Sequence, residues 1–218
     1  MNSDPVVIVS AKRSPSGAFL GAFKSLAATD LGGSAIRAVV DAAHLKPDEI
    51  QEVFMGCVLP AGLGQAPARQ AMFKSGLDRS TGCTTVNKVC GSGMRSIMLA
   101  HDFLLLEPHA IAVAGGMESM SNAPYLLTKG REGYRLGHDK IMDHMILDGL
   151  QDAYKGGQSM GVFAENTAEK YGFTRDEQDQ YAIESGKRAL KAQAEGLFKD
   201  EIVPIEIIDK KSTTSVNE

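Results

Sequence analysis

A cysteine between an apolar run and a helix is the residue of this chain best suited to covalent chemistry. Residues 84–89 predict a strand that ends at Cys90, and Gly91, Ser92 and Gly93 open a helix directly after it. Free backbone N–H groups and the helix dipole stabilise a thiolate at such a position, which lowers a cysteine pKa from about 8.5 into the range of about 3.5–7.5. The glycines leave room for an electrophile. The pattern predicts a sulfur nucleophile that accepts an acyl group.

The helix after Cys90 has to hold that thiol in place. It is apolar on nearly all sides and therefore predicted to be buried; its large apolar residues are Met94, Ile97, Met98, Leu99, Phe103, Leu104, Leu105 and Leu106. A small cysteine buried in the core is the alternative interpretation of Cys90. A rigid interior helix that directs its N-terminus at one point favours the reactive thiol.

The elements around this helix alternate between strand and helix patterns. The expected strands are residues 6–10, 52–58, 84–89, 111–114 and 201–208, and the expected helices are residues 31–43 capped by Asp30, 67–75, the helix after Cys90, 161–171 and a helix from Thr174. Strands separated by helices imply right-handed crossovers and a mostly parallel sheet. Residues 125–157 show no clear period and predict an excursion over the core. The polar residues 210–218 predict no further element.

Four ordered blocks of the sequence resemble the thiolases. The block around Cys90, Val86-Asn87-x-x-Cys90-Gly91-Ser92-Gly93-Met94-x-Ser96-Ile97, is similar to their acyl-enzyme signature. Residues 7–21 resemble a thiolase N-terminus, residues 114–121 resemble the segment after the next core strand, and residues 160–168 resemble the start of the loop domain that covers coenzyme A. The blocks extend over nearly the whole chain.

This resemblance implies an α/β fold: a thiolase-like βαβαβαββ core layer with part of an inserted loop domain. Residues 1–120 would form the N-terminal core domain and residues 121–218 a partial, CoA-covering loop domain, with the C-terminal core domain absent. We therefore expect an N-terminal portion of a thiolase. The expected activity is acyl-CoA C-acyltransfer through a Cys90 thioester, which joins two acetyl-CoA molecules into acetoacetyl-CoA and CoA or runs the reverse thiolysis.

The resemblance also assigns residues and partners. Leu150, Ser159 and Met160 are implied as neighbours of the pantetheine arm, although Met160 also fits as core filler. In thiolases, a histidine, an asparagine-containing motif and a second cysteine come from the C-terminal half, so the chain alone is expected to be inactive or slowly acylated. The expected partners are acyl-CoA, CoA and further copies in a homodimer or homotetramer, with no metal and no bound redox cofactor.

The remaining titratable residues give weaker signals. His101 lies eleven residues along the helix from Cys90, about 16 Å away at about 1.5 Å per residue, so it cannot act as the base. His138 and His144 lie in the excursion, where we expect surface positions. Cys57 and Cys83 are predicted to be buried structural residues. Glu118 is open to two interpretations, a buried paired carboxylate or a solvated one.

Composition excludes several functional classes. The chain has 218 residues, 43% hydrophobic residues and a net charge of −4, which suits a globular core and provides no basic surplus for nucleic acid. No signal segment or long apolar run is apparent, and three cysteines without ligand spacing indicate a reducing compartment, so we expect a cytoplasmic protein. We expect no membrane association.

Two alternatives to a thiolase stay open at this point. One is a related condensing enzyme, a β-ketoacyl synthase or hydroxymethylglutaryl-CoA synthase, which shares the fold and a cysteine nucleophile but has a different sequence around it. The other is a non-catalytic acyl-CoA-binding or assembly module derived from a thiolase. Neither the acyl chain length nor the physiological direction follows from these residues.

Overall fold

A parallel three-stranded sheet forms the centre of the computed structural model, which describes residues 5–209 and 212–217. Its strands are β1 (Glu52–Gly56), β2 (Gly82–Val86) and β3 (Ala112–Gly116), in the order β2-β1-β3. The three carboxyl ends are level, because Gly56 pairs with Val86 on one side and with Gly116 on the other. The α/β class and the parallel sheet are as predicted from the sequence.

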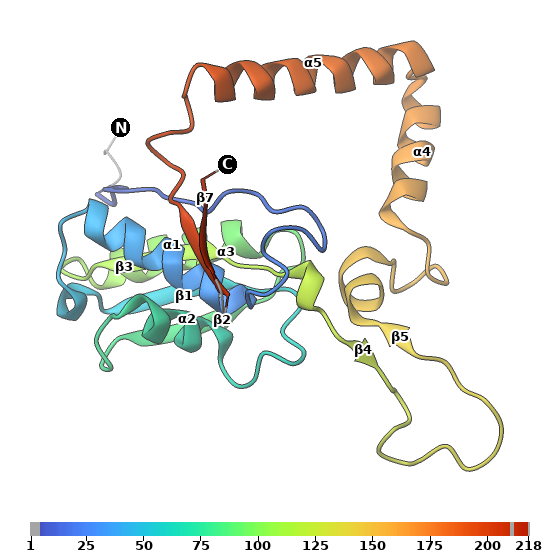
Figure 1. Cartoon of the computed structure of the whole chain (residues 1–218), viewed down its shortest axis with the longest axis horizontal. Coiled ribbons are helices and arrows are strands. Elements are labelled where there is room, and N and C mark those ends of the chain that lie inside the picture. Colours follow the sequence, from blue (N-terminus) through green and yellow to red (C-terminus); the bar gives the residue numbers. More distant parts are fainter. Residues whose placement is uncertain (1–4, 210–211, 218) are drawn as a thin grey trace.

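Three helices cover the sheet (Figure 1): α1 (Ala28–Ala42), α2 (Pro67–Ser75) and α3 (Ser92–Leu106). The chain moves from β1 to one edge through α2 and then back across β1 to the other edge through α3. Because each crossover is right-handed, this reversal places α2 and α3 on opposite faces. The α1 helix packs beside α2. It begins at Ala28 rather than after Asp30, whose carboxylate instead accepts a hydrogen bond from Ala27 N at 2.9 Å.

The core lies between the sheet and the layer of α1 and α2. Alternate residues of β1 face this layer, and Val53 and Met55 are 0% and 2% exposed. Phe54 points to the other face, where its ring meets Phe103 of α3 edge-on at 6.1 Å between centroids. The helices α1 and α2 contribute half of the core, namely Ala28, Ile36, Val40, Ala68, Ala71 and Met72, and loop residues such as Ile50, Cys57, Leu77 and Met117 complete it.

The predicted burial of α3 is right for only one of its faces. Small residues Ser92, Ser96 and Ala100 are buried and let the helix axis approach the sheet closely. Phe103 packs on the sheet, but most of the other large apolar residues point away, and Met94 is 72% and Leu106 is 81% exposed. The expectation of burial on all sides was therefore wrong for this chain, because the sheet can cover only one side of the helix.

The strand predicted at residues 6–10 is not formed. Val7, Ile8 and Val9 are 71%, 82% and 69% exposed, and residues 6–10 do not join the sheet at either of its outer strands, β2 or β3. The segment passes instead to Arg13, which bridges to Ile202 near the other end of the chain. An apolar run is therefore not sufficient for a strand, because pairing depends on contacts with distant segments.

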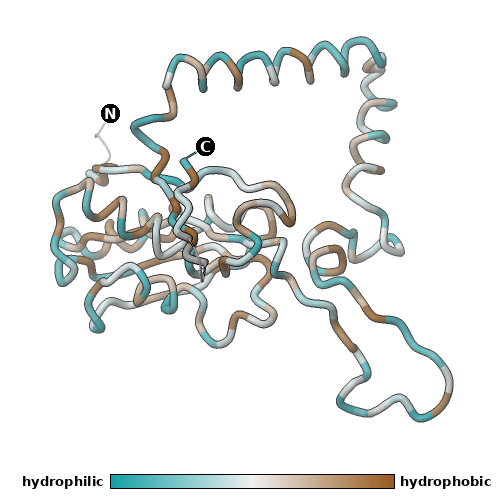
Figure 2. Tube along the Cα trace, in the orientation of Figure 1, coloured by the Kyte–Doolittle hydropathy of each residue, from teal (hydrophilic) through white to brown (hydrophobic). Residues whose placement is uncertain are grey.

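After β3 the chain leaves the sheet, as predicted for the excursion. The two-residue strands β4 (Tyr125–Leu126) and β5 (Met142–Asp143) pair at the base of a long, largely hydrophilic loop (Figure 2). Then α4 (Met160–Tyr171) and α5 (Arg175–Ala194) form an arm that stands away from the sheet and buries no residue. The predicted capping box is present, with Thr174 Oγ1 accepting from Glu177 N at 3.2 Å.

The end of the chain forms a hairpin rather than the featureless tail that the sequence suggested. Strand β6 (Ile205–Asp209) begins directly after Pro204, which has no N–H to donate, and pairs antiparallel with β7 (Ser212–Val216). Within the predicted polar tail, residues 210, 211 and 218 lie outside the described residues. In the part of the chain that the structure describes, no helix combines the length and apolar character needed to cross a membrane.

Candidate active site

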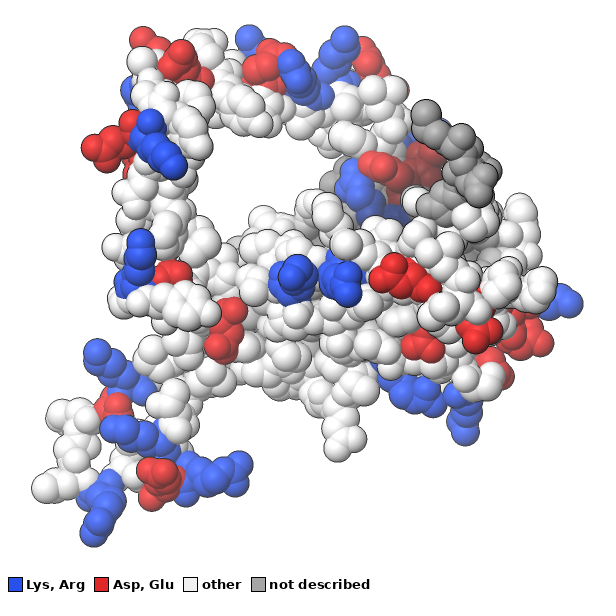
Figure 3. All heavy atoms as spheres, turned by 180° about the vertical axis from the view of Figure 1, so that it is seen from behind, with Lys and Arg blue, Asp and Glu red and all other residues white. Residues whose placement is uncertain are grey.

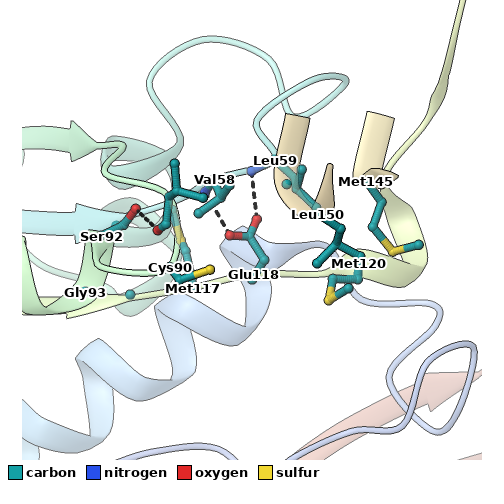
Figure 4. A pocket seen from close by; sticks show the side chains of 14 residues that line it. Val58, Leu59, Cys90, Ser92, Gly93, Met117, Glu118, Met120, Met145 and Leu150 are labelled. Carbon is teal, nitrogen blue, oxygen red and sulfur yellow. Dashed lines mark hydrogen bonds between the residues drawn. The ribbon is translucent and has the colours of Figure 1, made fainter. Parts of the chain in front are cut away.

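A cavity of about 410 Å³ opens at the carboxyl edge of the sheet (Figure 4). Each strand delivers one part of its wall: the loop after β1 provides Val58 and Leu59, the turn after β2 provides Cys90, and the segment after β3 provides Met117 and Glu118. The fourth part is the turn of π-helix at Ile146–Leu150 with the residue before it. Ligands of α/β proteins bind at this edge, where neighbouring crossovers diverge.

Cys90 lines this cavity and is exposed, one residue before the N-cap of α3. Its placement at the helix start is therefore as predicted, and the interpretation as a buried core cysteine is wrong. The strand that delivers it is shorter than predicted, since β2 ends at Val86. A turn fills the gap between Val86 and Cys90 and determines where the sulfur lies.

That turn contains an unusual backbone conformation. Val89 has φ +47, in the left-handed region that a β-branched side chain rarely adopts. Ser92 holds the turn from inside: its Oγ donates to Val89 O at 2.6 Å and accepts from Lys88 N at 2.9 Å. Asn87 Oδ1 accepts from Val89 N at 2.9 Å. The sequence patterns gave no role to the Asn87 and Ser92 side chains, because these contacts exist only in the folded turn.

Three glycines seat the start of α3 against the sheet. A Cβ at Gly56 would lie 2.7 Å from Gly93 N, and a Cβ at Gly116 would lie 3.4 Å from Gly93 Cα. The backbones of β1, β3 and α3 therefore meet here without side chains between them. We expected the glycines beside Ser92 to make room for an electrophile, but the structure gives Gly93 a packing role.

Glu118 is half-buried and binds the loop after β1. Its carboxylate accepts hydrogen bonds from Val58 N at 2.8 Å and Leu59 N at 3.0 Å (Figure 4). The Cys57 thiol lies 3.8 Å from the same carboxylate. Burial, and secondly the negative charge of Glu118, raises the pKa of Cys57 to about 12. Of the two interpretations left open for Glu118, the structure supports the paired carboxylate.

The other cysteine outside the cavity is Cys83, which lies in β2 and is half-buried. Burial is also the main cause that raises its pKa. Cys57 is 1% exposed, as predicted for a structural cysteine, whereas Cys83 is less buried than expected. Neither belongs to the wall of the cavity that contains Cys90.

The residues implied for the pantetheine arm lie at two adjoining cavities. Leu150 lines the cavity of Cys90 and also a second cavity of about 310 Å³. Ser159 and Met160, at the start of α4, line only the second one. Met160 is 47% exposed, so it does not fill the core of this chain. The structure thus brings the three residues together at the second cavity, and of the three only Leu150 also lines the cavity of Cys90.

The surface position expected for His144 was wrong. His144 is 5% exposed, because its side chain packs between the loop after β1 and the turn of π-helix. Its partner Asp148 is one turn further along the chain. Among residues 5–209 and 212–217, no group of three or more His, Cys, Asp or Glu side chains is arranged to hold a metal ion.

Comparison with known proteins agrees with this arrangement. A family model described as thiolase, N-terminal domain, matches residues 6–218. The chain is 50% identical over 211 residues to acetyl-CoA acetyltransferase 1 of Arabidopsis thaliana, a match that covers 97% of this chain and 51% of that protein.

Bacterial proteins match over a similar extent. A probable acetyl-CoA acyltransferase of Staphylococcus aureus is 46% identical over 206 residues, and an acetyl-CoA acetyltransferase of Chromobacterium violaceum is 45% identical over 206 residues. Each match covers 94% of this chain and 52% of the other protein. The chain spans about half the length of the curated relatives it matches.

Proposed function

Because the chain belongs to the thiolase family, we propose that it supplies the acyl-accepting half of an acetyl-CoA acetyltransferase. The observation that carries this proposal is the position of Cys90, exposed at the start of α3 in the wall of a cavity on the carboxyl edge of the sheet. The names of the relatives, acetyl-CoA acetyltransferase and acyltransferase, support the substrate class.

The proposed reaction has two transfers. In the first, the Cys90 thiolate attacks the carbonyl carbon of an acyl-CoA; a thioester to Sγ forms as the bond to CoA breaks, and CoA leaves as a thiolate that takes up a proton. In the second, acetyl-CoA loses a proton from its α-carbon to a base. The resulting carbanion attacks the Cys90 thioester and releases acetoacetyl-CoA and the Cys90 thiolate. Thiolysis is the reverse sequence.

The described residues at the cavity contain no evident base for the second transfer. No histidine lines its wall, and Glu118, its one carboxylate, already accepts hydrogen bonds from two backbone amides. We therefore propose that the base comes from a second half, as the thiolase resemblance implies. The exposed apolar face of α3 supports this, because a packed second layer would remove it from water.

Further parts of the proposal concern ligands and assembly. We propose that Leu150, Ser159 and Met160 contact the pantetheine arm, since they line adjoining cavities beside Cys90. CoA thioesters are the substrates, and no further cofactor is proposed. A homodimer or homotetramer and a cytoplasmic location complete the proposal; the three free thiols are in keeping with a reducing compartment.

The decisive experiment removes the Cys90 thiol from the full-length protein. Replacing Cys90 with Ala, or alkylating it stoichiometrically with iodoacetamide, is expected to lower kcat at least about 10³-fold. Mass spectrometry after incubation with labelled acetyl-CoA should find the acetyl group on the peptide of Cys90. Cys83→Ala is the matched control and should retain activity.

Activity that survives complete loss of the Cys90 thiol would show that the nucleophile is misassigned. Acetylation of Cys90 without any acetoacetyl-CoA would favour the non-catalytic binding module. For the 218-residue chain alone, we expect slow acetylation at most and no condensation.

A further inference from the structure

The His144 side chain uses both of its ring nitrogens. Nδ1 lies 2.6 Å from Asp148 Oδ2, and Nε2 lies 3.4 Å from Ala61 N. A backbone N–H can only donate, so Nε2 must accept and the ring proton must be on Nδ1, where it donates to the carboxylate. Asp148 therefore fixes the tautomer that can bind Ala61.

These contacts connect two walls of the cavity at Cys90. Ala61 follows Leu59, which lines the cavity in the loop after β1. His144 is followed by Met145, and Asp148 by Gly149 and Leu150, all three of which line the opposite part. The walls are already close, since a Cβ at Gly149 would lie 3.3 Å from Leu59 Cδ2. The position of the imidazole therefore affects the spacing between the walls.

The loop after β1 is held from its other side by Glu118, through the amides of Val58 and Leu59. The His144 backbone is anchored as well, because its N–H donates to Pro124 O at 3.1 Å. Glu118 connects the loop to the end of β3, and the bond from Ala61 N to His144 connects the loop to the excursion. Loss of the bond to His144 leaves Leu59 and Leu150 free to separate, while Cys90 and α3 keep their positions.

We propose that His144, oriented by Asp148, is a positioning residue that sets the width of the acyl-binding cavity and thereby the preferred length of the acyl chain. The proposal rests on the proposed function, because it takes the cavity beside Cys90 as the acyl site. Both His144 nitrogens are engaged in these contacts, so the ring does not transfer a proton in the reaction. His144 therefore affects the binding of the substrate and the preferred acyl chain length rather than the chemical step.

Two substitutions in the full-length protein separate the contacts of the ring. His144→Gln places an amide oxygen where Nε2 lies and can keep the bond from Ala61 N, whereas His144→Asn keeps a donor near Asp148 and loses the bond from Ala61. Asp148→Ala removes the orienting carboxylate, and its half-exposed side chain makes it the variant least disruptive to folding. His138→Gln, an exposed histidine of the same excursion, is the matched control.

The measurement is steady-state thiolysis of acetoacetyl-CoA and of 3-ketohexanoyl-CoA. His144→Asn and Asp148→Ala are expected to raise KM for acetoacetyl-CoA about 3- to 10-fold, as loss of one hydrogen bond implies, with kcat changed less than about 3-fold. The ratio of kcat/KM for the longer substrate to that for the shorter one should rise in both variants. It should stay near the wild-type value in His144→Gln and His138→Gln.

An unchanged ratio in Asp148→Ala, or a fall in kcat at constant KM, would overturn the inference. Acetylation of Cys90 is measured in every variant to separate this outcome from failure of the proposed function. If the wild type acquires no acetyl group, the proposed function fails. If Cys90 is acetylated and the ratio does not move, only the role of His144 is wrong.

Discussion

At the scale of single residues, the position of Cys90, the proposed nucleophile, depends on a short turn whose strain is offset locally. A β-branched residue with φ near +47 costs about 1–3 kcal/mol, and Val89 adopts this conformation directly before Cys90. The three hydrogen bonds of Ser92 and Asn87 in this turn contribute about 0.5–1.5 kcal/mol each, which is enough to offset that cost. The position of the sulfur thus depends on side chains of neighbouring residues in the same turn.

The contrast between Cys57 and Cys90 gives a prediction at this scale. Cys57 is buried beside Glu118 with a pKa of about 12, so almost none of it is thiolate at a pH of about 8. Iodoacetamide should label the exposed Cys90 first and Cys57 last, as followed by mass spectrometry of the cysteine peptides. Equal labelling rates for Cys57 and Cys90 would contradict the burial argument.

The same shift has a consequence for stability. Because the pKa of Cys57 in the folded protein lies above the ordinary thiol value of 9.0, its contribution to the free energy of unfolding is constant below a pH of about 9 and falls as the pH rises toward about 12. Urea unfolding at a series of alkaline pH values would detect this loss. Cys57→Ala should flatten that part of the profile relative to the wild type.

At the scale of elements, bare backbone contacts set the position of α3. Gly56 ends β1, Gly116 ends β3, and Gly93 lies in the first turn of α3, where a Cβ added to Gly56 or Gly116 would lie within 3.4 Å of Gly93 backbone atoms. Small residues continue this contact along the helix through Ser96 and Ala100. The sheet and α3 therefore form one unit, and a displacement of either moves Cys90.

The substitution Gly56→Ala tests whether the close contact between β1 and α3 sets the position of Cys90. The added methyl group would meet backbone atoms of Ser92 and Gly93 at 2.7 Å, which no side-chain rotation can relieve. We expect the free energy of unfolding to fall by about 1–3 kcal/mol and the rate of Cys90 acetylation to fall with it. Denaturant unfolding and labelling with acetyl-CoA measure the two effects.

Gly186→Ala is the control for this substitution. Gly186 lies inside α5 with no atom within 4 Å of a built Cβ, so alanine should stabilise the helix by up to about 1 kcal/mol. Acetylation should be unchanged in this control. A Gly56→Ala protein that is as stable and as reactive as the wild type would show that the close contact does not position α3.

At the scale of the whole molecule, the outer face of α3 is not covered by any other part of the described chain. The α1 and α2 layer buries the main core, while α3 on the opposite face leaves large apolar side chains in water. Seen from behind in Figure 3, the middle of the molecule shows few charged side chains, whereas charges gather on the arm and the long loop. An apolar, weakly charged face of this kind indicates a surface that packs against further protein.

A hydrophobic dye can detect this face. We expect the 218-residue chain to bind anilinonaphthalene sulfonate, and Ile97→Lys combined with Leu106→Lys to lower the fluorescence, because both residues are at least half exposed on α3. The full-length protein should bind much less dye per molecule, since its second half would cover α3. Dye binding that is unaffected by the two substitutions would place the exposed apolar surface elsewhere.

Local patterns in the sequence were sufficient for most of the elements and for the placement of Cys90 at the start of a helix. The alternation of strands and helices, the capping box at Thr174 and the junction at Cys90 each depend on neighbours a few residues away, so they are visible in sequence and are present in the structure. The thiolase resemblance was confirmed in the same way, because its motifs are contiguous blocks.

Contacts between distant segments decided the rest. Residues 6–10 have the composition of a strand yet form none in the structure, because strand formation depends on tertiary pairing that composition alone does not determine. The sequence predicted a surface position for His144, but in the fold its ring contacts Ala61. Glu118 binds backbone amides of a loop some sixty residues earlier in the chain, a contact that only the fold creates. The sequence by itself determined the family, the position of Cys90 at the start of a helix and most of the elements around it. Only the tertiary structure determined which side chains shape the cavity around it, because hydrogen bonds and packing across the molecule depend on distances in space rather than along the chain.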